Sequence, residues 1–122
     1  MKLTETEELL MEYLWQQEKA FMRDLLDAYP EPKPATTTVA TLLKRMIDKG
    51  FVAYQEFGNS RQYYPLVKKE VYFSNHVNGL IKNFFNDSTA QFASFFAKQA
   101  DFTTQELEDL KQIIENQLKN KT

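Results

Sequence analysis

Apolar residues recur at three- and four-residue spacing in the segment LTETEELLMEYLWQQ, which is the period of a helix with one buried face. Thr4 and Glu7 have the spacing of a capping box, so we expect this helix to begin beside Thr4. A second, shorter helix is predicted at about 21–28. It ends there because the next segment, YPEPKP, is rich in proline, which cannot continue a helix.

The segment ATTTVATLLKRMIDK has two contrasting faces and predicts a third helix that ends at Gly50. Its apolar face carries Val39, Leu42, Leu43, Met46 and Ile47. The opposite face carries Thr37, Thr38, Thr41, Lys44, Arg45 and Asp48. Threonine is a weak helix former, so propensity does not explain a run of threonines in the first turn. A surface that presents small hydroxyl groups does explain it.

A β-hairpin is predicted after the third helix. The segments FVAYQEF and RQYYPLV are rich in β-branched and aromatic residues, and Gly-Asn-Ser lies between them as a turn. Pro65 predicts that the second strand ends at a sheet edge. Three helices followed by a hairpin is the element order of a winged helix-turn-helix, which we assign to residues 1–67.

Residues 68–122 are predicted to form a three-helix dimerisation domain, so the fold class is mainly α with a small β-hairpin. A segment this short is only marginally stable alone, and a second copy supplies a matching surface by symmetry. The apolar positions expected at the dimer interface are Phe73, Val77, Leu80, Ile81, Phe84, Phe85, Phe92, Phe95, Phe96, Leu107, Leu110 and Ile114.

Charge is distributed unevenly along the chain, although the formal net charge is only −2. The segment from Lys33 to Lys68 has a net charge of +4, whereas the first 32 residues have −5. Binding to phosphates depends on the local surface, so an acidic scaffold with one basic face is compatible with duplex DNA.

These patterns favour a DNA-binding surface that consists of the helix at about 36–48 and a wing at about 57–62. The residues expected to contact bases or phosphates are Thr37, Thr38, Thr41, Lys44, Arg45, Asn59, Ser60 and Arg61. One alternative is an ordinary solvated helix face. A second is a winged-helix module that binds a protein partner without sequence-specific DNA binding.

Enzyme chemistry is not expected. The chain has no cysteine and a single histidine, His76, which is better explained as a packed residue than as a metal ligand. Glu5, Glu7, Glu8 and Glu12 are interpreted as a solvated helix face, and Tyr63 and Tyr64 as packing residues. No cofactor or metal site is predicted. No apolar run is long enough to span a bilayer and no secretory signal is visible, so the expected location is the cytoplasm.

The chain resembles the penicillinase-repressor (BlaI/MecI/CopY) family in LTETEELLMEYLW, TTTVATLLKRMIDKGFV, GNSRQYYPLV and DFTTQELEDL. The string TVATLLKRMIDKG is the most specific part and is similar to the family's recognition helix. The resemblance implies a homodimeric repressor whose two recognition helices read an inverted repeat in a promoter. Thr38, Thr41 and Arg45 match the family's helix, and the wing from Gly58 to Arg61 is implied to add phosphate contacts.

The chain also departs from that family. Thr37 stands where a basic residue is frequent, and Ala35 stands where a serine N-cap is common, so Thr36 or Thr37 is expected to cap the helix. The cysteine cluster of the copper-responsive branch is absent, so metal sensing is not expected. Members that respond to β-lactams are released by a membrane sensor-protease system that cuts the tail before a phenylalanine. The corresponding bond here is Phe95–Phe96, without the asparagine that precedes the cut elsewhere.

Overall fold

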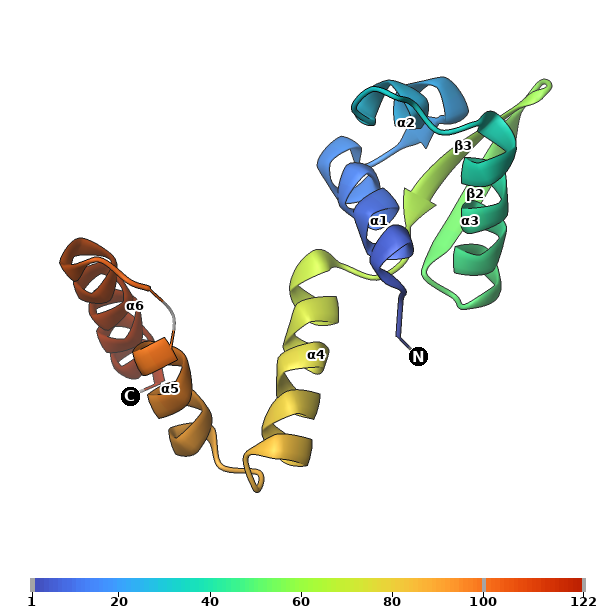
Figure 1. Ribbon diagram of the computed structural model, residues 1–122. Coiled ribbons are helices and arrows are strands. Elements are labelled where there is room, and N and C mark those ends of the chain that lie inside the picture. Colours follow the sequence, from blue (N-terminus) through green and yellow to red (C-terminus); the bar gives the residue numbers. More distant parts are fainter. Residues whose placement is uncertain (1, 100, 122) are drawn as a thin grey trace. The chain divides into compact units, whose positions relative to one another are not determined.

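The computed structural model describes residues 2–99 and 101–121, which form six helices and a three-stranded antiparallel sheet (Figure 1). The chain divides into two compact units, Met1–Asn75 and His76–Thr122. The first unit contains helices and strands, whereas the second is helical. The predicted fold class, mainly α with a winged helix-turn-helix followed by a helical tail, is confirmed.

The first unit begins with three helices, α1 (Glu5–Gln17), α2 (Met22–Ala28) and α3 (Thr36–Asp48). The predicted capping box opens α1. The Glu7 backbone N–H donates to Thr4 Oγ1 at 3.3 Å, and the Thr4 backbone N–H donates to Glu7 Oε1 at 2.8 Å. Two backbone groups that the start of a helix leaves unpaired are thereby satisfied.

Three strands form the sheet, β1 (Ala20–Phe21), β2 (Val52–Phe57) and β3 (Ser60–Pro65), in the order β1-β3-β2. The sequence predicts the β2–β3 hairpin but not β1, which pairs with β3 at Ala20↔Tyr63. Placing Phe21 in a helix is therefore wrong. The Phe21 backbone N–H instead donates to the Asp24 carboxylate at 2.9 Å, and α2 starts one residue later.

Pro65, which is predicted to end the second strand at a sheet edge, lies at the end of β3, and β3 is otherwise the central strand of the sheet. Pro65 pairs with Val52 of β2, whereas β1 reaches only Gln62 and Tyr63. The end of β3 that carries Pro65 therefore has one neighbour, and a residue without an N–H group is accommodated there.

A two-residue turn joins β2 to β3, since Phe57 pairs with Ser60 across Gly58 and Asn59. Gly58 has a φ of 60°, a backbone conformation that disfavours side chains, and glycine at the first turn position is typical of tight hairpins. The turn therefore fixes the register of the wing.

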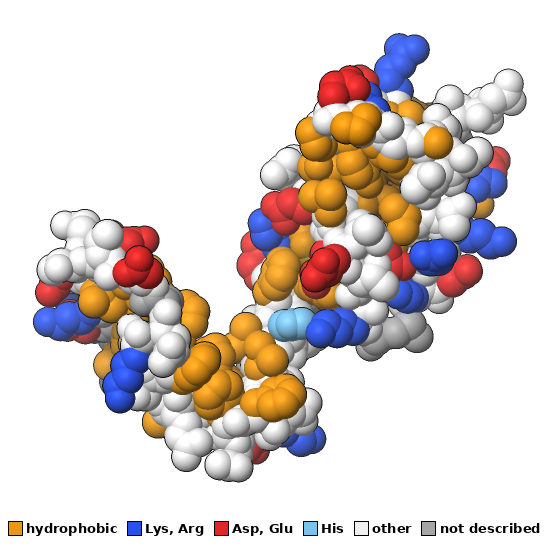
Figure 2. All heavy atoms as spheres, viewed as in Figure 1, with side chains coloured by type: hydrophobic (Ala, Val, Ile, Leu, Met, Phe, Trp, Pro, Cys, Tyr) orange, Lys and Arg blue, Asp and Glu red, His pale blue; other side chains and the backbone are white. Residues whose placement is uncertain are grey.

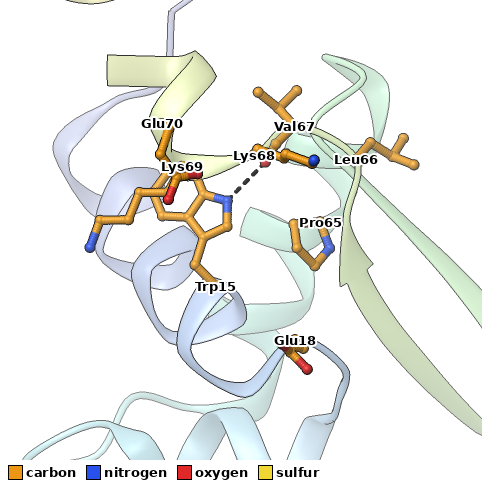
Figure 3. Close-up of a pocket in the computed structure, with 8 residues that line it drawn as sticks. All are labelled: Trp15, Glu18, Pro65, Leu66, Val67, Lys68, Lys69 and Glu70. Atoms are coloured by element: carbon orange, nitrogen blue, oxygen red, sulfur yellow. Dashed lines mark hydrogen bonds between the residues drawn. The ribbon is translucent and has the colours of Figure 1, made fainter. Parts of the chain in front are cut away.

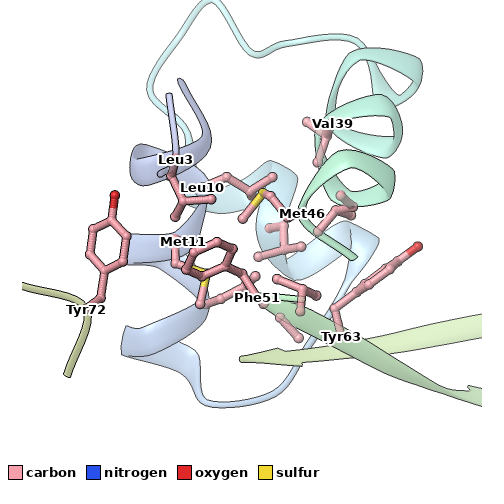
Figure 4. Close-up of a cluster of buried hydrophobic side chains, with 13 residues drawn as sticks. Leu3, Leu10, Met11, Val39, Met46, Phe51, Tyr63 and Tyr72 are labelled. Carbon is pink, nitrogen blue, oxygen red and sulfur yellow. The ribbon is translucent and has the colours of Figure 1, made fainter. Parts of the chain in front are cut away.

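The core of the first unit lies between α1, α3 and the sheet (Figure 4). α3 buries Val39, Leu43 and Met46 against this core, while Leu42 and Ile47 are partly buried, as the two-faced pattern predicts. The other members of the core are Leu3, Leu10, Met11, Leu14, Ala20, Leu25, Phe51, Val52, Tyr63 and Tyr72.

The start of α4 (Lys69–Phe84) is packed into the first unit. Trp15 Nε1–H donates to the Val67 carbonyl at 2.8 Å, and the Phe51 and Tyr72 rings meet edge to face at 5.7 Å. The first unit therefore continues to Asn75, beyond the expected domain boundary at residue 67.

The second unit contains the end of α4 together with α5 (Thr89–Gln99) and α6 (Thr104–Lys121). Phenylalanines pack on one another in a chain of ring contacts, with Phe85 against Phe92 and Phe95, and Phe96 against Phe92 and Phe102. Within the described parts of the chain, no helix is both long enough and apolar enough to cross a membrane.

Candidate nucleic-acid interface

The exposed face of α3 is built by the helical period. Val39, Leu43 and Met46 point into the core, so the opposite side of the helix faces outward. The predicted contact residues on this helix are all exposed, namely Thr37, Thr38, Thr41, Lys44 and Arg45. The structure therefore brings these five side chains together on the outer face of one helix. That helix, α3, lies beside β2 (Figure 1).

The N-terminus of α3 has no side-chain cap. Ala35 is the N-cap residue, so the expectation that Thr36 or Thr37 provides the cap is wrong. The first intrahelical bonds are donated by Thr38 and Val39 to the Ala35 carbonyl, at 3.0 Å and 3.3 Å. The N–H groups of Thr36 and Thr37, at the positive end of the helix dipole, come before these bonds and have no acceptor within the helix.

The Thr41 hydroxyl is oriented by its own helix. Thr41 Oγ1–H donates to the Thr37 carbonyl at 2.9 Å. Its proton is used in this bond, and the oxygen lone pairs and the methyl group remain on the exposed side. Thr41 therefore presents a hydrogen-bond acceptor and an apolar methyl side by side.

Fewer basic side chains are available on this surface than the charges along the sequence indicate. The Lys33 ammonium donates to the carbonyls of Leu26, Asp27 and Tyr29 at 3.2, 3.3 and 2.8 Å and so closes the C-terminus of α2. Lys49 pairs with a buried carboxylate. The exposed basic residues of this segment that remain are Lys44, Arg45, Arg61 and Lys68.

That carboxylate belongs to Glu7, so placing Glu7 on a solvated helix face is wrong: its side chain is fully buried. Lys49 Nζ lies 2.7 Å from Glu7 Oε1. Burial alone would raise the pKa of Glu7, but the hydrogen bonds from Lys49 and Thr4 outweigh it and hold the pKa below the ordinary value of 4.5. Glu7 is therefore a charged residue inside the fold.

The wing carries one cation with a fixed direction. Arg61, on β3 opposite Glu56, holds its guanidinium 4.3 Å from the centre of the Tyr54 ring. Asn59 in the turn and Ser60 at the start of β3 are both exposed. Tyr63 is buried, as expected of a packing residue. An aromatic platform beneath Arg61 restricts the positions that its charge can take.

The residues expected at a dimer interface fall into four environments. Phe73 packs on Trp15 and Tyr72 within the first unit, at ring distances of 5.8 Å and 5.2 Å. Ile81 is buried. Val77, Phe85, Phe92 and Leu110 are partly buried, whereas Leu80, Phe84, Phe95, Phe96, Leu107 and Ile114 are exposed. Hydrophobic side chains gather on the visible face of the second unit in Figure 2.

An open hollow lies where the chain passes from β3 into α4 (Figure 3). Trp15 forms one wall, the segment 65–70 forms another, and Glu18 lies at the rim. Lysines and glutamates both line it, so it has no single sign of charge. None of the predicted DNA-contact residues is among those that line it, so it is separate from the α3 face.

In the comparison with protein families, the model described as Penicillinase repressor matches residues 3–116. A comparison with curated proteins found no match. Among solved structures, the chain is similar to BpsR of Bordetella bronchiseptica, whose DNA binding is regulated by 6-hydroxynicotinic acid. The TM-score is 0.50 at 13% identity, over 95% of this chain and 80% of BpsR, which is evidence for a shared fold.

The region matched by the family model includes all of α1 to α5 and most of α6. It therefore contains the α3 face, the wing and, except for Leu118, the large exposed apolar residues of the second unit. The chain belongs to the penicillinase-repressor (BlaI/MecI/CopY) family, whose members are DNA-binding transcriptional regulators and not enzymes.

Proposed function

We propose that this protein is a homodimeric transcriptional repressor that binds a palindromic operator with α3 in the major groove and the β2–β3 hairpin as a wing. The observation that carries the proposal is the outer face of α3, where hydroxyls and cations are exposed opposite an apolar face that packs on the core. A helix of this length and polarity fits the major groove, and the groove presents a distinct pattern for each base pair.

Each side chain on this surface has a role that follows from its chemistry. Thr38 and Thr41 are short enough to approach base edges, and their methyl groups suit the C5-methyl of thymine. Arg45 is assigned to a guanine edge or a phosphate. Lys44, Thr37 and the uncapped first turn of α3 are assigned to phosphates.

The wing is assigned to the DNA backbone. Arg61 projects from β3 over Tyr54, and Asn59 and Ser60 are exposed at the tip. Contacts of this kind set the orientation of a protein on the duplex without reading the sequence.

The second unit is assigned to dimerisation. Large apolar side chains are exposed there, with 75% of Phe84, 62% of Leu118 and 57% of Ile113 accessible. A two-fold partner would cover the same patch on both copies. Two linked recognition helices bind two half-sites with a high effective concentration, so the palindrome follows from the symmetry of the dimer.

Release by proteolysis of the tail is part of the proposal. The bond Phe95–Phe96 lies inside α5, and both side chains are about half exposed. Phe95 packs on Phe85, whereas Phe96 packs on Phe92 and Phe102. A cut at this bond therefore divides the aromatic cluster and weakens any dimer that depends on it.

The test is selection of bound duplexes from a random pool, followed by measured affinities. We expect an enriched palindrome, and a loss of about 1–3 kcal/mol for Arg45→Ala if it contacts a base. Lys111→Ala on α6, which removes the same unit charge in the second unit, is the control. A Lys44→Ala/Arg45→Ala variant that still binds the palindrome at full strength would contradict the assigned face. An unenriched pool would favour a protein-binding module.

A further inference from the structure

An ion pair between the buried Glu7 carboxylate and Lys49, whose side chain is 25% exposed, connects two elements of the first unit. Glu7 lies in the first turn of α1, and Lys49 is the C-cap residue of α3. The Lys49 backbone N–H donates to the Arg45 carbonyl at 2.9 Å, while its ammonium lies 2.7 Å from Glu7 Oε1. The end of the candidate recognition helix is thus joined to the start of α1.

The Glu7 carboxylate that binds Lys49 is itself held in place. Glu7 Oε1 also accepts the Thr4 backbone N–H at 2.8 Å, so the capping box holds the side chain in one rotamer. Glu7 Oε2 is buried and has no hydrogen-bond partner among the described residues. Among the described residues, Lys49 is the cation that pairs with this carboxylate.

A gain in stability alone does not explain why an ion pair with a fully buried carboxylate is present here. The loss of hydration on burial offsets much of the attraction, and apolar residues of similar size are often equally stable in its place. An ion pair with hydrogen-bond geometry also constrains the orientation of the elements that it joins. The apolar contacts of α3, through Val39, Leu43 and Met46, are not directional and leave the helix some freedom to tilt.

A small tilt matters at the other end of the helix. Thr38 lies eleven residues from Lys49, or about 16 Å along the axis. A rotation of about 10° at the Lys49 end therefore displaces Thr38 by about 3 Å. Hydrogen-bond lengths vary by only about 0.5 Å, so such a displacement would break a contact between Thr38 and a base.

We propose that Glu7 and Lys49 are positioning residues that fix the tilt of α3, and thereby the placement of Thr38, Thr41 and Arg45 on the operator. This inference rests on the proposed DNA-binding function. Neither residue touches DNA, and both act through the helix that does.

The test is the variant Glu7→Gln/Lys49→Met, which keeps an acceptor for the Thr4 N–H and leaves no unpaired charge in the core. The matched control is Glu12→Gln/Lys69→Met. It removes the partly exposed 2.8 Å pair that also involves α1 and leaves the net charge unchanged. Both variants are compared with the native chain in urea unfolding and in binding to the selected palindrome, under conditions where circular dichroism shows both folded.

We expect Glu7→Gln/Lys49→Met to bind the palindrome at least tenfold more weakly than the control, with an unchanged slope of affinity against salt. Discrimination against a scrambled duplex should fall. Affinity equal to that of the control would overturn the proposal. So would an equal loss on both duplexes with a salt slope smaller by about one, because Lys49 would then be a phosphate contact.

A measurement without DNA separates this inference from the proposed function. If the native chain selects no duplex, the proposed function fails, but amide hydrogen exchange still reports on α3. Faster exchange from Thr38 to Arg45 in Glu7→Gln/Lys49→Met, and not in the control, supports the positioning role. Unchanged exchange in α3 overturns it.

Discussion

The Glu7 carboxylate has no solvent exposure, so it keeps its charge only while Lys49 and the Thr4 N–H stay beside it. A carboxylate on the surface is stabilised by water, and in this buried place the two hydrogen bonds take over that role. The same reasoning applies to Lys33, whose three bonds to the end of α2 make an exposed lysine part of the fold. At this scale, geometry decides whether a charge is available to a ligand.

Removing one member of the Glu7–Lys49 pair should cost more than removing both. Lys49→Met leaves the Glu7 carboxylate uncompensated, and we expect the free energy of unfolding to fall by about 3 kcal/mol. Glu7→Gln/Lys49→Met should recover most of this loss. Urea unfolding of the two variants and the native chain measures the difference. Equal stability of Lys49→Met and the native chain would contradict the burial of the carboxylate.

Acid should remove the contribution of Glu7. Its pKa in the folded chain is below the ordinary 4.5, so the folded state favours the ionised form. The stabilisation is complete above pH 4.5 and is lost as the pH falls through the lowered folded value. We expect the native chain to lose stability in this range relative to Glu7→Gln/Lys49→Met. A stability difference independent of pH between 7 and 3 would contradict it, and Glu5→Gln on the exposed side of α1 is the control.

At the scale of elements, the start of α4 is held to α1 by polar contacts as well as by rings. Tyr72 Oη–H donates to the Glu8 carboxylate at 2.6 Å, and Lys69 pairs with Glu12 at 2.8 Å. The Trp15 side chain joins the same junction through its bond to the Val67 carbonyl. The first turns of α4 therefore belong to the unit that carries the DNA-binding surface.

Tyr72→Phe tests this junction. Burial, together with the hydrogen bond to Glu8, raises the pKa of Tyr72 to about 12. Because the pKa of this phenol is raised in the folded state, the protonated hydroxyl stabilises the fold at any pH below the ordinary pKa of 10. That stabilisation is lost as the pH rises towards 12. We expect Tyr72→Phe to lower the free energy of unfolding by about 1.5 kcal/mol near neutral pH, because a hydrogen bond to a charged group is lost.

The readouts for that variant are urea unfolding and ultraviolet phenolate titration. The native chain should show one tyrosine that ionises at about 12, and Tyr72→Phe should lack it. Tyr64→Phe, which removes a hydroxyl from β3 instead, is the control. Persistence of the late ionisation in Tyr72→Phe would show that it belongs to another tyrosine.

The whole molecule consists of two units with different surfaces. Both expose some large apolar side chains, but the buried hydrophobic cluster and the polar, basic helix face lie in the first unit. In the described part of the second unit Ile81 is the one buried hydrophobic residue, and large apolar side chains such as Phe84 and Leu118 are exposed. Exposed apolar patches on a folded chain commonly mark an interaction surface. This contrast is what the proposed dimer explains.

A charge placed on the exposed apolar surface should separate the subunits. Phe84→Asp introduces a carboxylate at a side chain that is 75% exposed, so the fold of the unit should persist. We expect sedimentation equilibrium to show a dissociation constant at least tenfold higher than that of the native chain. Asn83→Asp adds the same charge at the neighbouring exposed position. An unaltered dimer in Phe84→Asp would exclude Phe84 from the interface.

Local rules account for most of the elements of this protein. Helical periodicity locates α1 and α3, and a glycine-containing turn locates the hairpin. Thr103 and Glu106 have the spacing of a capping box and form one at the start of α6. Each of these signals acts over a few residues, so it is visible before the chain folds. The exposed face of α3 follows from the same periodicity.

The third strand, the buried carboxylate and the true extent of the basic surface required the tertiary structure. β1 exists because Ala20 meets Tyr63, and Glu7 is ionised in the core because Lys49 arrives from 42 residues away. Two residues are too short to show a strand pattern. A capping-box glutamate has the same sequence spacing whether its side chain is solvated or buried, so the pattern does not distinguish the two. Desolvation and pairing are properties of the folded arrangement, so only the assembled unit decides them.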